Sequence, residues 1–249
     1  MPLLSSDALI LRTYKVGETS KVVVLLTRER GKVRAVAKGA RSGRPRYQSA
    51  LEPLSEVRVG LYGRQGAELL RMGPCELLRS AFRAGERGLT EALHLSYFAE
   101  LLDAFAQEGE AEDDVYRLAL AVVGAALGGT DTGVLARYLE AWLLKLHGLY
   151  PPLDRCAGCG NATGTGGLDY DAAAHGFVCA ACRPASGPFL PEGARGFLAD
   201  MFRRGPAAIE GIVPEAARAL EPFHEMLIGR HLERTLKSLR VMKAAGTPA

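Results

Sequence analysis

The chain has 249 residues, with 31 Lys and Arg, 28 Asp and Glu, and five cysteines. No stretch approaches the ~18 uninterrupted apolar residues of a membrane-spanning helix, and no basic segment followed by an apolar run marks a secretory signal at the N-terminus. We therefore expect a globular protein of the reducing cytoplasm, where cysteines stay unpaired.

The charge is divided unevenly along the chain. Residues 1–80 hold 15 Lys and Arg against 7 Asp and Glu, whereas residues 81–249 hold 16 against 21. A basic half beside an acidic half indicates a polyanionic partner for the basic part. The alternative is a basic face that only contacts solvent.

The N-terminal part reads as short strands separated by glycine-rich turns. The strands are rich in Val, Leu and Ile, as expected for strands. They are predicted at residues 9–14, 21–27, 32–38, 57–62 and 68–72. Five strands in this length favour a small barrel, with the OB-fold as the five-stranded candidate and a sandwich or SH3-like fold as alternatives. We predict that this barrel domain covers residues 1–80.

Basic residues gather on the third strand and on the loop after it. Because side chains of a strand alternate between faces, Lys32, Arg34 and Lys38 share the face opposite the core. The following loop, residues 39–47, has three arginines and no acid. Phosphate-backbone binding needs such a surface. The predicted DNA-binding residues are Lys32, Arg34, Lys38, Arg41, Arg44 and Arg46.

Aromatic residues near this surface are candidates for stacking on DNA bases. Tyr47, and less directly Tyr14, could each contribute ~1–3 kcal/mol in that way. Half-buried packing is the more common role for a tyrosine, and we favour it for both. Whether the distant Arg195, Arg203 and Arg204 extend the DNA track is left open by the sequence.

The C-terminal part, residues 81–249, has the period of helices. Apolar residues recur every third or fourth position, which is one face of a helix. The helices are predicted at residues 89–105, 112–127, 135–146, 191–204 and 214–243. Pro222 is expected to break or kink the last of them. The fold class is therefore α+β and multidomain, with a barrel followed by a helical bundle.

Four cysteines form two Cys-x-x-Cys pairs between two of these helices. Nineteen residues separate Cys156 and Cys159 from Cys179 and Cys182, which is a zinc-binding spacing. The predicted module covers about 154–186 and is inserted in the helical bundle. Unrelated thiols, two disulfides, or His175 as a substitute ligand are the alternatives. Four thiolates close the shell around one Zn²⁺ and leave no open position, so its role should be structural.

Signatures of catalysis are missing from the sequence. There is no phosphate-binding Gly-x-x-x-x-Gly-Lys-Ser/Thr loop, no strand-linked Gly-x-Gly-x-x-Gly and no Gly-x-Ser-x-Gly elbow. We therefore expect no enzymatic activity. Two alternatives remain: a protein-interaction scaffold with incidental polyanion binding, and a metalloenzyme, which would need an open zinc position.

Several segments, in order along almost the whole chain, match one family. Lys38-Gly-Ala-Arg41 follows the strands, Leu51-Glu-Pro-Leu54 follows the loop, and a long stretch from Arg137 runs into Cys156. Leu236-Lys-Ser-Leu-Arg240 lies near the end. In these segments the chain resembles the RecO family, bacterial recombination mediators of the RecF pathway of DNA repair.

The resemblance implies an N-terminal OB-fold, a helical domain and a zinc module. It implies binding of single- and double-stranded DNA, annealing of complementary strands, and loading of RecA onto DNA coated by single-strand-binding protein. The implied partners are RecR, RecF through RecR, and single-strand-binding protein, in the cytoplasm at the nucleoid. The family's zinc ligands fall on the four paired cysteines, and its basic loop falls on Lys38 and Arg41.

Overall fold

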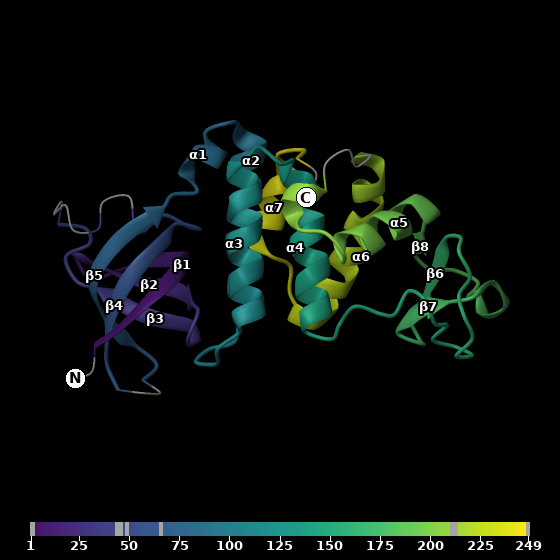
Figure 1. Cartoon of the computed structure of the whole chain (residues 1–249), viewed down its shortest axis with the longest axis horizontal. Helices are drawn as coiled ribbons and strands as arrows, with labels where there is room; N and C mark the ends of the chain where they lie inside the picture. Colours follow the sequence, from purple (N-terminus) through teal and green to yellow (C-terminus); the bar gives the residue numbers. More distant parts are fainter. Residues whose placement is uncertain (1–2, 43–46, 48–49, 65–66, 210–213, 248–249) are drawn as a thin grey trace. The chain divides into compact units, whose positions relative to one another are not determined.

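A computed structural model describes residues 3–42, 47, 50–64, 67–209 and 214–247. Its elements are labelled in Figure 1. The chain forms two compact units, which we describe separately: Met1–Thr132 with Leu236–Thr247, and Gly133–Thr235 with Pro248–Ala249. Among the helices of the described residues, none is long and apolar enough to cross a membrane.

The first unit contains a closed five-stranded barrel, in the order β1-β2-β3-β5-β4. Its strands are β1 (Leu3–Val16), β2 (Ser20–Thr27), β3 (Gly31–Ala37), β4 (Glu56–Tyr62) and β5 (Leu70–Arg79). Neighbouring strands are antiparallel except β3 and β5, which pair in parallel and close the barrel. The predicted barrel is confirmed. The domain boundary at residue 80 stays a prediction, and the last strand of the barrel ends at Arg79.

Two strands are longer than their sequence patterns indicate. β1 begins at Leu3 because its first half pairs with β4, while its second half pairs with β2. β5 continues to Arg79 because it follows β4 along its length. Pairing with a neighbour extends a strand beyond the short β-branched run that marks it in the sequence.

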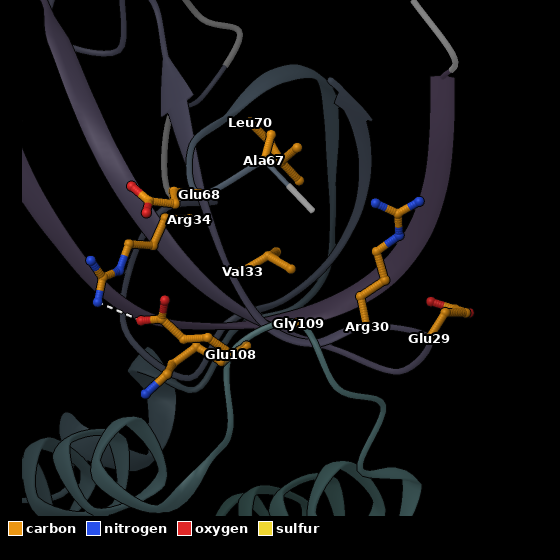
Figure 2. Close-up of a pocket in the computed structure, with 10 residues that line it drawn as sticks. Glu29, Arg30, Val33, Arg34, Ala67, Glu68, Leu70, Glu108 and Gly109 are labelled. Carbon is orange, nitrogen blue, oxygen red and sulfur yellow. Dashed lines mark hydrogen bonds and ion pairs between the residues drawn. The ribbon is translucent and has the colours of Figure 1, made fainter. Parts of the chain in front are cut away.

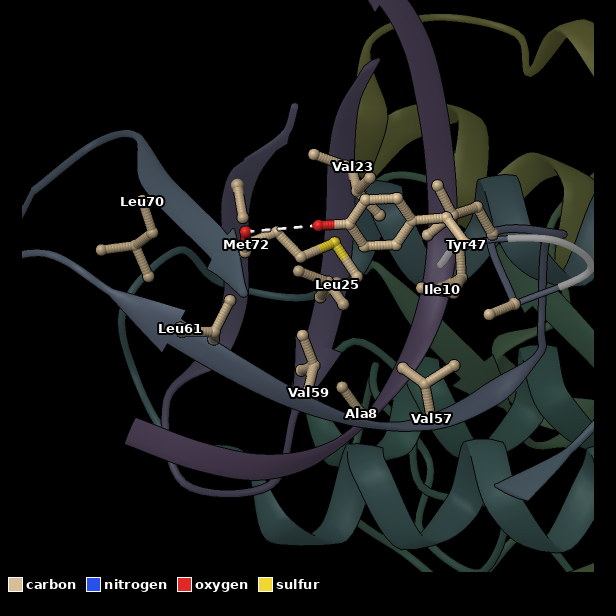
Figure 3. Close-up of a cluster of buried hydrophobic side chains, with 14 residues drawn as sticks. Ala8, Ile10, Val23, Leu25, Tyr47, Val57, Val59, Leu61, Leu70 and Met72 are labelled. Carbon is tan, nitrogen blue, oxygen red and sulfur yellow. Dashed lines mark hydrogen bonds between the residues drawn. The ribbon is translucent and has the colours of Figure 1, made fainter. Parts of the chain in front are cut away.

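Side chains that alternate inward fill the barrel, as Figure 3 shows. Ala35 and Ala37 of β3 are fully buried, which confirms the predicted core face of this strand. Tyr47 is buried as well, and its hydroxyl donates to the carbonyls of Met72 (3.4 Å) and Gly73 (3.2 Å). Cys75 packs against this core, and burial raises the pKa of its thiol to about 11.

Helices complete the first unit: α1 (Phe82–Gly85), α2 (Leu89–Phe105), α3 (Asp113–Leu127) and α7 (Lys237–Ala244). α2 packs against both β1 and α7. The carboxylate of Glu100 on α2 accepts hydrogen bonds from the N–H groups of Lys237 and Ser238 and from the Ser238 hydroxyl. A helix N-terminus favours such an anion, so Glu100 anchors α7 on α2.

The second unit consists of helices and a small sheet. Its elements are α4 (Thr132–Leu146), β6 (Leu168–Asp171), β7 (Gly176–Val178), the 3₁₀ helix η2 (Ala180–Cys182), β8 (Phe189–Leu190), α5 (Glu192–Met201), the 3₁₀ helix η3 (Pro206–Ala208) and α6 (Pro214–Leu232). The sheet order is β7-β6-β8. The helical bundle predicted after the barrel is confirmed, and the cysteine module follows α4.

A buried polar network joins α4 to α6 inside this unit. Arg137 donates to Glu140 at 2.6 Å, and the other carboxylate oxygen of Glu140 lies 2.9 Å from His224 Nδ1. The Tyr150 hydroxyl lies 3.0 Å from His224 Nε2. Burial lowers the pKa of His224, so the neutral ring donates to Glu140 and accepts from Tyr150.

Of the break or kink predicted at Pro222, the break is wrong. α6 continues through this residue to Leu232, and the helical chain stops instead at Glu233, where φ is +53°. Pro222 is exposed, so water can satisfy the carbonyl that its missing N–H leaves free. The left-handed backbone at Glu233 then redirects the chain into α7.

Candidate nucleic-acid interface and metal centre

The four paired cysteines converge on one point. Their sulfur atoms all lie within 4.8 Å of one another, and Cys159 Sγ is 3.7 Å from Cys179 Sγ. A tetrahedral site with Zn–S bonds of about 2.3 Å places its sulfurs about 3.8 Å apart. The cluster could therefore hold a metal ion, and His175, which is exposed on the β6–β7 turn, is not part of it.

Backbone N–H groups near Cys156 favour the thiolate form of this cysteine. The N–H of Cys179 donates to Cys156 Sγ at 3.3 Å. This hydrogen bond, and a second one from the N–H of Cys159, lower the pKa of Cys156 to about 6. The pKa of Cys182 is raised to about 12, because its thiol hydrogen-bonds to Cys159 first and also to Cys179 and Cys156. Thiolates are the form that ligates metal. The donor set thus fits a thiophilic ion.

Close packing of the two cysteine turns requires small residues. A Cβ on Gly158 would lie 3.3 Å from Cys182 Cβ, and Gly160 has a φ of +75°. The segments on either side of the first cysteine turn are linked by Arg195 of α5, whose guanidinium donates to the carbonyls of Leu153 and Gly166. The Arg195 side chain is therefore engaged in holding this module together.

Two of the predicted DNA-binding residues are engaged by acids of the same unit. Lys32 Nζ lies 2.6 Å from the carbonyl oxygen of Asp103 and 3.7 Å from its carboxylate. Arg34 lies 2.5 Å from the carboxylate of Glu108. Arg44 and Arg46 fall outside the described residues, so for them the sequence prediction stands alone.

The other two predicted residues lie beside the turn between β1 and β2. Lys38 is exposed directly after β3. Arg41 is exposed too, with its guanidinium 3.2 Å from the Gly17 carbonyl and its N–H bonded to the Thr19 carbonyl. These bonds fold the start of the basic loop back onto the β1–β2 turn.

Two further lysines, which the sequence analysis did not single out, join them there. Lys15 and Lys21 stand directly opposite each other in the β1–β2 pair, and Lys21 is also the partner of Ala37, next to Lys38. Like charges directly opposite destabilise a sheet, which favours a role in binding an anion. Glu18 in the turn offsets one charge. We call this group the rim cations: Lys15, Lys21, Lys38 and Arg41.

A row of outward-facing side chains crosses the barrel beside the rim cations. Strand register aligns one residue from each strand, and paired residues share a face. We call this the barrel row: Tyr14, Val22, Val36, Arg71 and Tyr62. Tyr14 is 37% exposed and Arg71 is exposed. The row combines aromatic rings, apolar surface and a guanidinium, which are the groups that bind nucleobases and phosphates.

The two tyrosines of the barrel row are held in different ways. The guanidinium carbon of Arg12 lies 4.7 Å from the ring centroid of Tyr14. Tyr62 lies over Gly73, where an added Cβ would approach its ring to 2.3 Å. Strand register, which the sequence alone does not fix, brings these two rings into one row. The sequence therefore offers no reason to select Tyr62 and Arg71 as candidate DNA-binding residues.

Comparisons with known proteins agree with this architecture. The family model described as Recombination protein O N terminal matches residues 1–81, and the one described as Recombination protein O C terminal matches residues 87–240. The chain is 34% identical to DNA repair protein RecO of Koribacter versatilis (strain Ellin345) over 247 residues, which are 96% of this chain and 98% of the relative. It is 34% identical to DNA repair protein RecO of Anaeromyxobacter sp. (strain K) over 242 residues, or 95% and 94% of the two chains. The chain therefore belongs to the RecO family of DNA repair proteins.

Proposed function

We propose that this protein is a non-enzymatic mediator of recombinational DNA repair. It binds single- and double-stranded DNA, anneals complementary strands and, with RecR, helps to load RecA onto DNA coated by single-strand-binding protein. The observation that carries the proposal is the barrel row beside the rim cations, in a chain of the RecO family. RecF is reached through RecR, and the protein works in the cytoplasm at the nucleoid.

The chemistry of annealing suits this surface. Two DNA strands repel each other through their phosphates, so a protein that promotes pairing must screen both backbones. Lys and Arg do this with little sequence preference. Base pairing then supplies the free energy, and no hydrolysis is needed. Lys38 and Arg41 belong to the DNA track in this account, joined by Lys15, Lys21 and Arg71.

The cysteine cluster supports a structural role for one Zn²⁺. Thiolate ligands favour zinc among the common divalent ions, and four of them leave no position for water or substrate. When bound, the ion would join the two cysteine turns, while Arg195 links the segments on either side of the first turn. In this proposal DNA is bound by the barrel, which carries the rim cations.

Replacing Tyr14 by alanine should weaken binding of single-stranded DNA by about 5- to 100-fold, because stacking on an aromatic ring contributes ~1–3 kcal/mol per base. Tyr14→Phe keeps the ring and is the matched control, with affinity close to that of the wild type. Fluorescence anisotropy with labelled oligonucleotides measures both. Equal affinities for the alanine and phenylalanine variants would remove Tyr14 from the interface.

A scaffold that binds only proteins is the second candidate function. It is favoured by the acidic balance of residues 81–249. Retention of the protein on a single-stranded DNA resin at moderate salt separates the two functions, because incidental attraction between charges is screened there.

A further inference from the structure

A hollow on the barrel, distinct from the barrel row, is lined by cations and carboxylates. Its volume is about 410 Å³, and Arg30, Lys32, Arg34, Glu68 and Glu108 contribute to its wall. Figure 2 shows Arg34 beside Glu108, and Arg30 on the other side of Val33. Three cations from a single strand and the turn before it would suit a phosphate backbone, yet carboxylates of the same chain stand among them.

The segment that carries Glu108 is attached to the edge of β3. The Lys32 N–H donates to the Gln107 carbonyl, and the Gly109 N–H donates to the Lys32 carbonyl, both at 3.0 Å. Gly31 permits this approach, since a Cβ there would lie 1.8 Å from the Glu110 carbonyl oxygen. The segment 107–110 therefore covers the start of β3.

Three acids from this region pair with four cations of the barrel. Asp103 meets Lys32 and also Arg12, at 3.5 Å, while Glu108 meets Arg34. A fourth pair joins Arg28 to Asp113 at 2.9 Å. A carboxylate accepts from a guanidinium as a phosphate does, so these acids occupy the positions that phosphate oxygens would take.

We propose that the hollow is a further binding site for the nucleic-acid phosphate backbone, held closed by Asp103 and Glu108. This inference rests on the proposed DNA-binding function. The DNA strand reaches Arg34 only by displacing the Glu108 carboxylate, and Lys32 is held by both the carbonyl and the carboxylate of Asp103, so the barrel row and rim cations bind first. The Arg34–Glu108 pair is the easier to displace, because both side chains are about half exposed and such pairs contribute only ~0–1 kcal/mol.

Substituting Glu108→Gln tests the proposal without unfolding the protein. Freeing Arg34 for one phosphate should strengthen binding of a labelled oligothymidine about fivefold at ~0.1 M salt. The slope of log affinity against log salt concentration should become steeper by about 0.7. Glu110→Gln is the matched control, because Glu110 is exposed two residues away and its loss removes the same charge. The control should change affinity less than about twofold.

A second substitution links the gain to Arg34. Arg34→Ala should abolish the fivefold gain in the Glu108→Gln background, and its effect in the wild type should be smaller because Glu108 competes with DNA for the guanidinium. Equal affinities of Glu108→Gln and Glu110→Gln in a protein that binds DNA would overturn this inference alone. Failure of the wild-type protein to bind DNA would overturn the proposed function as well.

Discussion

Replacing the four rim cations by alanine should weaken the binding of single-stranded DNA about a thousandfold at ~0.1 M salt. Each phosphate contact contributes a slope of about 0.7 in the dependence of log affinity on log salt, or about 1 kcal/mol at this salt concentration. Loss of four contacts should therefore reduce the slope by about 3. Anisotropy titrations over a range of salt concentrations give both quantities.

A variant with the same net charge separates local contacts from general attraction. Arg83, Arg117, Lys237 and Arg240 are exposed cations of the same unit that lie on α1, α3 and α7 and not on the barrel. Replacing these four by alanine removes the same charge but should leave the salt slope nearly unchanged. Both variants should melt as the wild type does, because the rim side chains lie outside the buried core. If the two variants bound DNA equally well, the rim would not be the DNA track.

Removing the metal should destabilise the second unit far more than the first. The free energy of metal binding contributes to folding, with apparent values of ~10–16 kcal/mol in zinc-finger peptides. The small sheet is short, so we expect chelation to expose residues 154–190 and to loosen the packing of α4 and α5. Hydrogen exchange should show lost protection there and retained protection in the barrel, with a weaker loss of DNA binding.

The same experiment can identify the coordination shell. Cobalt in place of zinc should give the intense charge-transfer absorption of four thiolates, and Cys179→Ser should diminish it. The matched control is Cys75→Ser, because Cys75 lies against the barrel core, outside the thiol cluster. Unchanged melting after chelation, or the spectrum of a water-coordinated, mixed-ligand site, would contradict a closed structural site.

The sequence predicts a strand or helix well where its apolar residues follow a single clear period or form one β-branched run. The β-branched run at residues 21–27 and the apolar stripe from Leu89 to Phe105 correspond to β2 and α2 almost residue for residue. The Cys-x-x-Cys pairs predict the thiol cluster because each pair places two sulfurs on one turn. In these cases the signal lies within a few residues of the element it describes.

The composition of the basic surface depends on contacts between distant residues, and there the sequence is insufficient. Alternation correctly predicts that Arg34 and Lys38 face away from the core, but it does not show that Glu108 meets Arg34 from 74 residues away. Strand register aligns Tyr14 with Arg71 and Tyr62 across four strand pairs. Sequence patterns carry the period of each strand and not its register.

The segment that leads into the cysteines also depends on a contact with a distant residue that its sequence pattern does not show. The stretch from Arg137 to Cys156 carries much of the family resemblance, which the comparisons confirm. The structure explains part of this stretch physically, because Arg137 donates to Glu140, and Glu140 and Tyr150 both hydrogen-bond His224 in a buried network. Removal of one member would leave buried polar groups without partners, so these residues depend on one another.

The most direct test of the account is annealing of complementary strands coated with single-strand-binding protein, with and without RecR and in the absence of nucleotide. We predict that the wild-type protein accelerates strand pairing without nucleotide hydrolysis, and that RecR increases this effect on coated strands. The variant that lacks the four rim cations should lose the acceleration. The control variant, in which four helix cations are replaced by alanine, should retain it. Annealing by the rim variant at the wild-type rate would contradict the claim that the barrel surface screens the DNA backbones.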